Sequence, residues 1–282
     1  VDAAGQRRAR DVEVLRHASN AACDLRNPAQ VKSLLRGIGV ELPDTRAWRL
    51  EAIRDSHPLI DALLEWRKAE RIATTFGYGW LDENLGPDCR LRGEWSGCDG
   101  AAGRMTASAG LHNMPAHLRS AVIAEAGHVF VRADLGQIEP RILAAVSGDR
   151  ALARATVADD MYLPVAEQLA VDRATAKVAV LGAMYGQTTG HGAAALRGLE
   201  MAYPIAMRFL TDADLAGQVG RDIRTYGGRL IRMGSHRSAE LSDRDSRSRA
   251  AARGRYGRNA MVQGAAAEFF KVWAVTVRSR AA

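Results

Sequence analysis

The sequence contains little cysteine and no long apolar run. Cys23, Cys89 and Cys98 are the only cysteines in 282 residues, and no two of them have the CxxC spacing. An odd, scattered set of this kind argues against a disulfide framework and against a zinc site. No apolar run approaches the roughly 18 residues that cross a membrane. We therefore expect a soluble protein without a membrane partner, in a reducing, cytoplasmic setting.

Lysine is also scarce, and both a starting methionine and an apolar signal segment are missing. Lysine occurs only at positions 32, 68, 177 and 271, so a lysine inside a motif stands out. Lys plus Arg number 39 against 32 for Asp plus Glu, a net charge of +7. This balance is typical of a protein whose partner carries phosphates, although a solvated Arg-rich surface explains it equally well. The charged start, VDAAGQRRAR, predicts a piece of a longer gene product.

The first third of the sequence has helical signals. Residues 1–26 are charged and Ala-rich, and we interpret them as a solvated helix. Asn27 and Pro28 then start a short helix with a Gly stop, and residues 58–76 have the apolar spacing of an amphipathic helix. Residues 77–110 are rich in Gly and short polar residues, which predicts turns and short strands in place of helix.

The remainder of the sequence mixes strand and helix signals. HVFVRAD, residues 128–134, has the apolar alternation of a strand, and a helix is predicted directly after it, from Ile138 onward. Residues 151–210 favour a block of helices that break at Pro164 and at residues 186–192.

Asp134 lies at the C-terminal end of the predicted strand, a common place for a metal-binding carboxylate. Phosphoryl and nucleotidyl transfer need divalent cations held by carboxylates, because charge develops on the attacking and leaving oxygens. Gln137, Glu139 and Arg141 follow within one turn and the start of a helix. This density of polar groups favours a site. The alternative is helix capping by Gln137 and Glu139, with a surface contact between Glu139 and Arg141.

A second group of polar residues recurs every four positions in DRATAKVAVLGAMYG. Asp172 is placed to cap the N-terminus of this helix. One face of the helix then carries Arg173, Lys177, Leu181 and Tyr185. Two cations at one end and a phenol at the other suit a nucleoside triphosphate, with the cations at the phosphates and the phenol near the base and sugar. A solvated basic stripe is the alternative.

A third group, in RYGRNAMVQG, places Arg255, Asn259 and Gln263 at the same fourfold spacing. These side chains donate hydrogen bonds, and purine N3 and pyrimidine O2 are minor-groove acceptors that every base pair offers. A copying enzyme can test the shape of a base pair through them; ordinary exposed positions on a helix are the alternative. Residues 226–258 are rich in Arg and Gly, so we predict that the final helix begins only near Ala265.

Four blocks of the sequence together resemble the ordered motifs of family A DNA polymerases, the bacterial DNA polymerase I group. They are GRMTASAGLHNMP, ADLGQIEPRILAAVSGD, RATAKVAVLGAMYG and RYGRNAMVQGAAAEFFK, and the similarity covers residues 27–273. The resemblance implies an α+β right-hand polymerase fold with an incomplete palm. Its parts are an N-terminal remnant at 1–26, a thumb at 27–92, a palm at 93–150 and 226–282, and fingers at 151–225.

The resemblance also implies roles for individual residues. Asp134 would bind both of two catalytic Mg²⁺ ions, assisted by the backbone carbonyl of Leu135. Lys177 would join Asp134 as a catalytic residue by giving a proton to the leaving pyrophosphate. The residues that contact the dNTP would be Gln137, Glu139, Arg173, Lys177 and Tyr185. Among these, Glu139 would be the steric gate that excludes a ribose 2′-hydroxyl.

The implied partners are primer-template DNA and dNTPs, bound by a monomer at the bacterial nucleoid. The residues that contact the primer-template duplex would be Arg104, Arg255, Asn259 and Gln263. The function that follows is DNA-directed DNA synthesis in replication or repair.

The sequence departs from the family pattern at several positions. Leu135 and Gly136 stand where the family has Tyr and Ser, and Leu181 where it has Phe or Tyr. Tyr162 stands where the family often has a phosphate-binding His. Family members also carry a second metal-binding Asp further along the chain than Ala282.

Two alternatives follow from these departures. Glu268 does not replace the second Asp, because it is too close to Gln263 and lies on a predicted helix, so a catalytically impaired primer-template-binding module stays open. A single-subunit RNA polymerase is a third possibility. Glu139 argues against it, because a bulky side chain there should block ribose.

Overall fold

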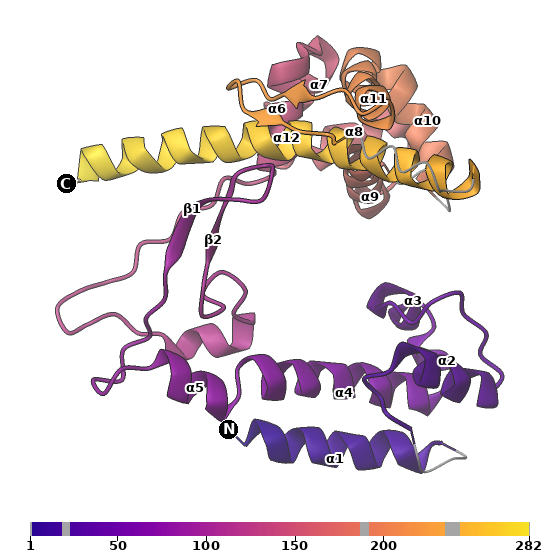
Figure 1. Cartoon of the computed structure of the whole chain (residues 1–282), viewed down its shortest axis with the longest axis vertical. Helices are drawn as coiled ribbons and strands as arrows, with labels where there is room; N and C mark the ends of the chain where they lie inside the picture. Colours follow the sequence, from indigo (N-terminus) through magenta and orange to yellow (C-terminus); the bar gives the residue numbers. More distant parts are fainter. Residues whose placement is uncertain (1, 19–22, 187–191, 235–242, 282) are drawn as a thin grey trace. The chain divides into compact units, whose positions relative to one another are not determined.

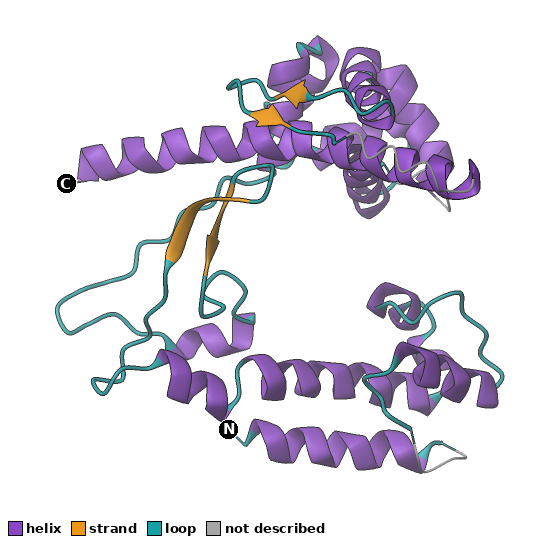
Figure 2. Ribbon diagram, viewed as in Figure 1, coloured by secondary structure: helices purple, strands orange, loops and turns teal. Residues whose placement is uncertain are grey.

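The computed structural model describes residues 2–18, 23–186, 192–234 and 243–281. The chain divides into two compact units, one of residues 1–94 and 107–124 and the other of residues 95–106 and 125–282. Helices make up most of both units, and the strands form two two-stranded sheets (Figure 2). The predicted α+β class is confirmed, while the boundaries of thumb, palm and fingers stay predictions. No helix within the described ranges is both long and apolar enough to cross a membrane.

Helices dominate the first unit. They are α1 (Ala3–Arg16), α2 (Pro28–Gly37), α3 (Ala47–Glu51), α4 (Pro58–Thr75) and α5 (Tyr78–Asn84), with short 3-10 helices at Arg54–Ser56 and Ala116–Ala121. The predicted helices at α2 and α4 are confirmed, and each begins with a Pro, whose missing N–H has no helical partner to lose there. The Asn27 side chain accepts hydrogen bonds from the N–H groups of Ala29 and Gln30, which caps α2.

The core of the first unit lies between α1 and α4, which run side by side (Figure 1). Val14 of α1 and Leu63 of α4 are fully buried, and Trp66 donates a hydrogen bond from Nε1 to Asp11 Oδ1 at 2.5 Å. The helix expected within residues 1–26 therefore forms. It is not solvated on all sides, because Val14 gives it an apolar contact with α4 that the charged sequence around it conceals.

Residues 77–110 contain a helix where turns and short strands were predicted. α5 forms there because Trp80 is held from two directions. Its ring meets the Phe76 ring edge-on at 5.3 Å between centroids, and its Nε1 donates to the Ala109 carbonyl at 2.9 Å. Tertiary contacts of this kind override a weak local propensity, and the sequence pattern does not reveal them.

Most of the second unit is helical as well. Its helices are α6 (Ile138–Ser147), α7 (Arg150–Ala155), α8 (Tyr162–Leu169), α9 (Arg173–Tyr185), α10 (Gly192–Ala202), α11 (Pro204–Gln218) and α12 (Asp243–Ala281). The sheets pair β1 (Trp95–Asp99) with β2 (Arg104–Ala107), where short strands were expected, and β3 (Ile223–Arg224) with β4 (Leu230–Ile231).

Two predictions about helix ends have different outcomes. Asp172 caps α9 as predicted, since its Oδ1 accepts a hydrogen bond from Thr175 N at 2.9 Å. Pro164 does not break a helix, because it lies in the first turn of α8, where proline is tolerated. The break lies ahead of it, in residues 156–161. Most of the other predicted break, at 187–191, lies outside the described residues.

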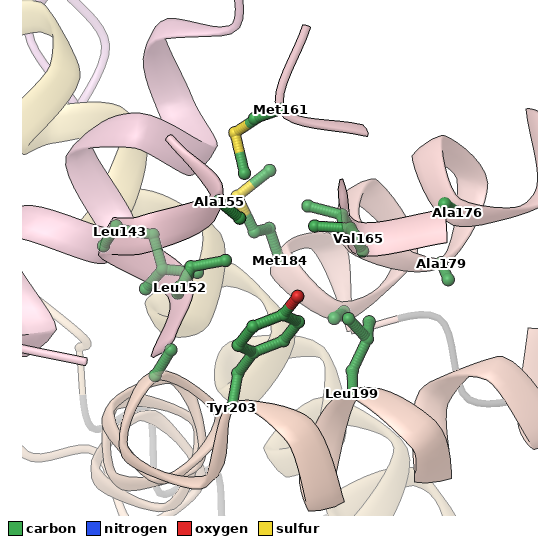
Figure 3. Close-up of a cluster of buried hydrophobic side chains, with 14 of the residues drawn as sticks. Leu143, Leu152, Ala155, Met161, Val165, Ala176, Ala179, Met184, Leu199 and Tyr203 are labelled. Carbon is green, nitrogen blue, oxygen red and sulfur yellow. The ribbon is translucent and has the colours of Figure 1, made fainter. Parts of the chain in front are cut away.

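A hydrophobic cluster forms the core of the second unit (Figure 3). Its buried members include Leu143, Leu152, Met161, Val165, Ala176, Ala179, Met184, Leu199 and Tyr203. The small side chains on the buried face of α9 let neighbouring helices approach closely. This packing leaves Arg173 and Lys177 of the same helix exposed.

The final helix is much longer than predicted. α12 begins at Asp243, within the Arg- and Gly-rich stretch, and not near Ala265. Two of its glycines lie at close approaches to other elements. A Cβ on Gly254 would stand 2.2 Å from Asp214 Oδ1, and a Cβ on Gly264 would stand 2.5 Å from Thr225 Cγ2. These glycines therefore permit packing, which offsets their low helix propensity.

Residues 128–134, which were predicted to form a strand, have no regular secondary structure. Within the described part of the chain, this segment pairs with no neighbouring strand. Its apolar side chains are exposed at fractions of 83% for Val129, 69% for Phe130 and 91% for Val131. The prediction was wrong because apolar alternation signals only the potential for pairing, and a strand also needs a neighbour for its hydrogen bonds.

Candidate functional site

Gln137 lies at the turn into α6, with its backbone in the left-handed region at φ 57°. It makes no side-chain capping bond to α6. Its amide Nε2 donates to Asp160 Oδ1 at 3.0 Å, and its Oε1 accepts from the N–H of Met161 at 2.9 Å. The alternative of helix capping by Gln137 is therefore wrong. The side chain instead joins the start of α6 to the segment that enters α8.

Glu139 lies in the first turn of α6 and meets the end of α9. Its Oε2 accepts a hydrogen bond from the Tyr185 hydroxyl at 3.0 Å. Burial, and then the charge of Glu139, raise the pKa of Tyr185, so the phenol keeps its proton and remains a donor. The two residues predicted to face a nucleotide's sugar and base are thus brought together from α6 and α9.

Arg141 does not make the surface contact with Glu139 that was the alternative to a site. Its guanidinium donates to backbone carbonyls of Gly136 at 3.0 Å, Thr156 at 2.5 Å, Ala158 at 2.9 Å and Asp159 at 2.7 Å. Five rigid N–H donors suit a site that gathers several carbonyls. Arg141 therefore fixes the loop between α7 and α8 against the turn that contains Gln137.

Arg173 and Lys177 begin the exposed face of α9. Arg173 donates from Nε to Asp160 Oδ2 at 2.5 Å, and its guanidinium lies 5.7 Å from the centre of the Tyr162 ring. The Arg173 hydrogen bond is the main cause of a lowered pKa at Asp160. Lys177, one turn later, has no hydrogen bond or ion pair to any residue that the structure describes. One cation is therefore engaged and the other is available.

Asp134 stands apart from these contacts. It is exposed, and its carboxylate makes no hydrogen bond or ion pair with the described residues. Those residues include no group of three or more His, Cys, Asp and Glu side chains that could hold a metal ion. The Asp134 carboxylate and the Leu135 carbonyl are oxygen ligands of the kind Mg²⁺ prefers, but they are too few to fit a complete two-ion site.

Glu268 is occupied elsewhere on α12. Its Oε1 accepts from the Thr225 hydroxyl at 2.5 Å and its Oε2 from the N–H of Gly227 at 2.9 Å. Both oxygens thus hold the β3–β4 hairpin against α12. This arrangement agrees with the expectation that Glu268 does not replace the second metal-binding Asp.

A cavity of about 240 Å³ opens beside Glu139. Its walls come from β2, α6 and α12, and the residues that line it are Arg104, Met105, Ile138, Glu139, Gln263, Ala266, Ala267 and Phe270. Arg104 and Gln263 are predicted DNA contacts. Burial raises the pKa of Tyr185, and a hydrogen bond with Gln263 and the charge of Arg104 partly offset that rise. Lys271 supports this wall by donating from Nζ to the Gly103 carbonyl at 2.7 Å.

The other two predicted DNA contacts lie further along α12. Arg255 is exposed, and its side chain packs at the end of α9, where a Cβ on Gly186 would stand 2.8 Å from Arg255 Cγ. Asn259 is half-buried and makes no hydrogen bond within the described ranges. Neither residue lines the cavity.

Comparison with known proteins decides the family. The model of DNA polymerase family A matches residues 13–282. The chain belongs to DNA polymerase family A. DNA polymerase I of Chloroflexus aurantiacus is 29% identical over 81% of this chain and 26% of its own length. The thermostable DNA polymerase I of Thermus aquaticus is 32% identical over 51% of this chain and 19% of its own length.

A solved structure has the same fold as this family A chain. It is the POL domain of Pol1 from M. smegmatis in complex with DNA primer-template and dNTP, with a TM-score of 0.76 and 23% identity. The match covers 99% of this chain and 54% of that chain. This chain therefore spans about half of the solved domain, and about a quarter or less of the two relatives above.

The sequence pattern did not reveal one residue that organises this family A site, Asp160, and it did not show that Arg141 binds backbone carbonyls. Asp160 lies between Gln137 and Arg173 and binds both, although it is 23 residues from the first and 13 from the second. The acidic pair at 159–160 just before Tyr162 is the only sequence signal for it. Nothing in the spacing indicates its partners.

Proposed function

We propose that this family A chain is part of a DNA-directed DNA polymerase that adds dNTPs to the primer 3′-hydroxyl of a primer-template duplex. The observation that carries the proposal is the cavity lined by Arg104, Glu139 and Gln263, whose Glu139 accepts the hydrogen bond of Tyr185. Tyr185 ends α9, the helix whose first turns expose Arg173 and Lys177. The chemistry is template-directed nucleotidyl transfer.

Different side chains would contact different parts of the nucleotide. Arg173 and Lys177 would bind the triphosphate as charge-assisted donors, and Arg173 would exchange the Asp160 carboxylate for a phosphate. Lys177 would also give a proton to the leaving pyrophosphate. Glu139 and Tyr185 would lie at the sugar, where the carboxylate blocks a 2′-hydroxyl. Before the nucleotide binds, Gln137 would position Arg173 through Asp160.

The duplex side of the site uses neutral and cationic donors. Arg104 and Gln263 border the cavity and can donate to the minor-groove acceptors that every base pair presents. Arg255 and Asn259 extend the same set along α12. Because these donors test pair geometry and not base identity, they suit a copying enzyme.

Members of this family use divalent metal ions, and two Mg²⁺ ions are expected here. Asp134 and the Leu135 carbonyl would hold these ions, which would supply positive charge to stabilise the reacting oxygens. Since these two ligands do not complete a two-ion site, turnover requires further oxygen ligands. A primer-template-binding module without turnover is therefore the second candidate function.

Primer extension by the gene's full-length product tests the proposal. Asp134→Ala should reduce extension by about three orders of magnitude, the loss of roughly 4 kcal/mol of transition-state stabilisation. Duplex binding, measured by gel shift, should be unchanged. Asp212→Ala, an exposed aspartate on α11, is the matched control and should extend normally.

Three outcomes decide between the functions. Retained extension in Asp134→Ala would overturn the assignment of the metal ligand. Duplex binding without any extension by the unaltered product would establish the binding module. Efficient extension with rNTPs in place of dNTPs would show an RNA polymerase and contradict the gate role of Glu139.

A further inference from the structure

Arg258 is a buried cation in the middle of α12. Its side chain is only 10% exposed, although the α12 residues predicted to contact DNA are more open to solvent. Burying a guanidinium costs free energy unless other groups replace its contacts with water. The burial also lowers the pKa of Arg258. Its partners must therefore offset a considerable cost.

The partners of Arg258 come from two other helices. Its Nε donates to the Ala183 carbonyl of α9 at 2.5 Å, and its Nη1 lies 3.9 Å from Asp214 Oδ2 of α11. Asp214 reaches α12 because Gly254 presents no side chain there. Arg258 thus joins three helices at one point.

The end of α9 needs a cation from outside the helix. The C-terminus of a helix carries partial negative charge, and the last turn of α9 contains no basic residue of its own. Arg258 supplies that charge at Ala183. Arg255, one turn earlier on α12, packs its side chain against Gly186, which ends α9. Two arginines of α12 therefore hold the last turn of α9.

The held turn contains Tyr185. Ala183 is two residues before it, so the bond to Arg258 fixes the backbone that carries the phenol to Glu139. We propose that Arg258 is a positioning residue that sets the sugar selectivity of the nucleotide site by holding Tyr185 against Glu139. The inference rests on the proposed function. Without Arg258, the last turn of α9 shifts, Glu139 loses its hydrogen-bond donor, and the carboxylate can turn away from a ribose 2′-hydroxyl.

Nucleotide binding in the full-length product, without turnover, tests this role. A primer ended in a dideoxynucleotide is annealed to template, and the dissociation constants of the next correct dNTP and rNTP are measured by gel shift of the ternary complex. Arg258→Met removes the charge at similar length. It should lower the preference for dNTP over rNTP by about tenfold, as expected for one lost hydrogen bond to a charged group.

Two further variants show whether the effect passes through Tyr185. Tyr185→Phe removes the donor to Glu139, and the double variant with Arg258→Met should lose no more selectivity than Tyr185→Phe alone. Arg258→Lys keeps a cation and should give an intermediate preference for dNTP over rNTP. It also keeps the test decisive if Arg258→Met does not fold. Arg253→Met is the matched control, because within the described residues Arg253 bonds to carbonyls at the end of α11 and its loss should leave the preference unchanged.

The outcomes separate this inference from the proposed function. A wild-type dNTP preference that Arg258→Met and Arg258→Lys leave unchanged would overturn the role of Arg258 alone. Additive losses in the double variant would do the same, since they would show that Arg258 does not act through Tyr185. Failure of the wild-type product to bind dNTP on a primer-template would overturn the proposed function itself.

Discussion

The two halves of HVFVRADLGQIEPR behave differently in the folded chain. The first half, residues 128–134, is exposed and unpaired within the described residues, and it ends at Asp134. The second half enters α6, and its Gln137, Glu139 and Arg141 all bond to residues of other elements. One continuous motif thus contains two kinds of segment. The second is held by side-chain bonds to other parts of the chain, and the first pairs with no strand among the described residues.

The difference teaches what each kind of element requires. A helix satisfies its backbone hydrogen bonds internally, so α6 forms and then offers its side chains to α9 and the segment before α8. A strand must find a neighbouring strand for its N–H and C=O groups. Residues 128–134 contain the side chains of a strand but lack such a neighbour among the described residues.

The largest expected effect contrasts Leu143 of α6, the helix that the second half enters, with Val131 of the first half. In the 282-residue chain, Leu143→Ala should reduce the free energy of unfolding by about 2–5 kcal/mol, because it leaves a cavity in the core of the second unit. Val131→Ala should change it by less than about 0.5 kcal/mol, because Val131 is exposed. Urea titration measures both. A large loss of unfolding free energy in Val131→Ala would contradict the difference between the two halves. Repeating both variants in the full-length product tests whether another segment covers Val131.

A smaller effect is expected from a pair of arginines. Arg141→Met should cost about 1–2 kcal/mol, since it removes a guanidinium that bonds to the carbonyls of 156–159 and leaves them partly unsatisfied. Arg132→Met, in the exposed half, is the matched control and should be neutral within about 0.5 kcal/mol. Equal losses in thermal unfolding would show that the two halves are not distinct.

The smallest effect is a pH dependence at Asp160. Because Arg173 lowers the pKa of Asp160 in the folded chain, the ion pair stabilises the fold above the ordinary aspartate pKa, about 4. That stabilisation is lost as the pH falls through the lowered value. Melting temperatures of wild type and Asp160→Asn should therefore differ at neutral pH and converge in acid. A difference that stays constant down to acidic pH would contradict the role of the ion pair.

Several elements were predictable because their signals are local. Asp172 and the periodicity after it predict α9 with its cap, and Asn27 with Pro28 predicts the start of α2. Other elements depend on distant partners. α5 exists because Trp80 contacts Phe76 and Ala109, and α12 continues through its glycines because α11 and the β3–β4 hairpin pack close to it.

The sequence by itself determined the family blocks and the residues that share a helix face, because spacing along a helix fixes direction from local geometry alone. It placed Arg173, Lys177 and Tyr185 on one face of α9. Only the tertiary structure decided their partners: Asp160 for Arg173, Glu139 for Tyr185, and Arg258 for the helix end. These pairs are separated by 13, 46 and 75 residues, and packing brings together what spacing cannot relate.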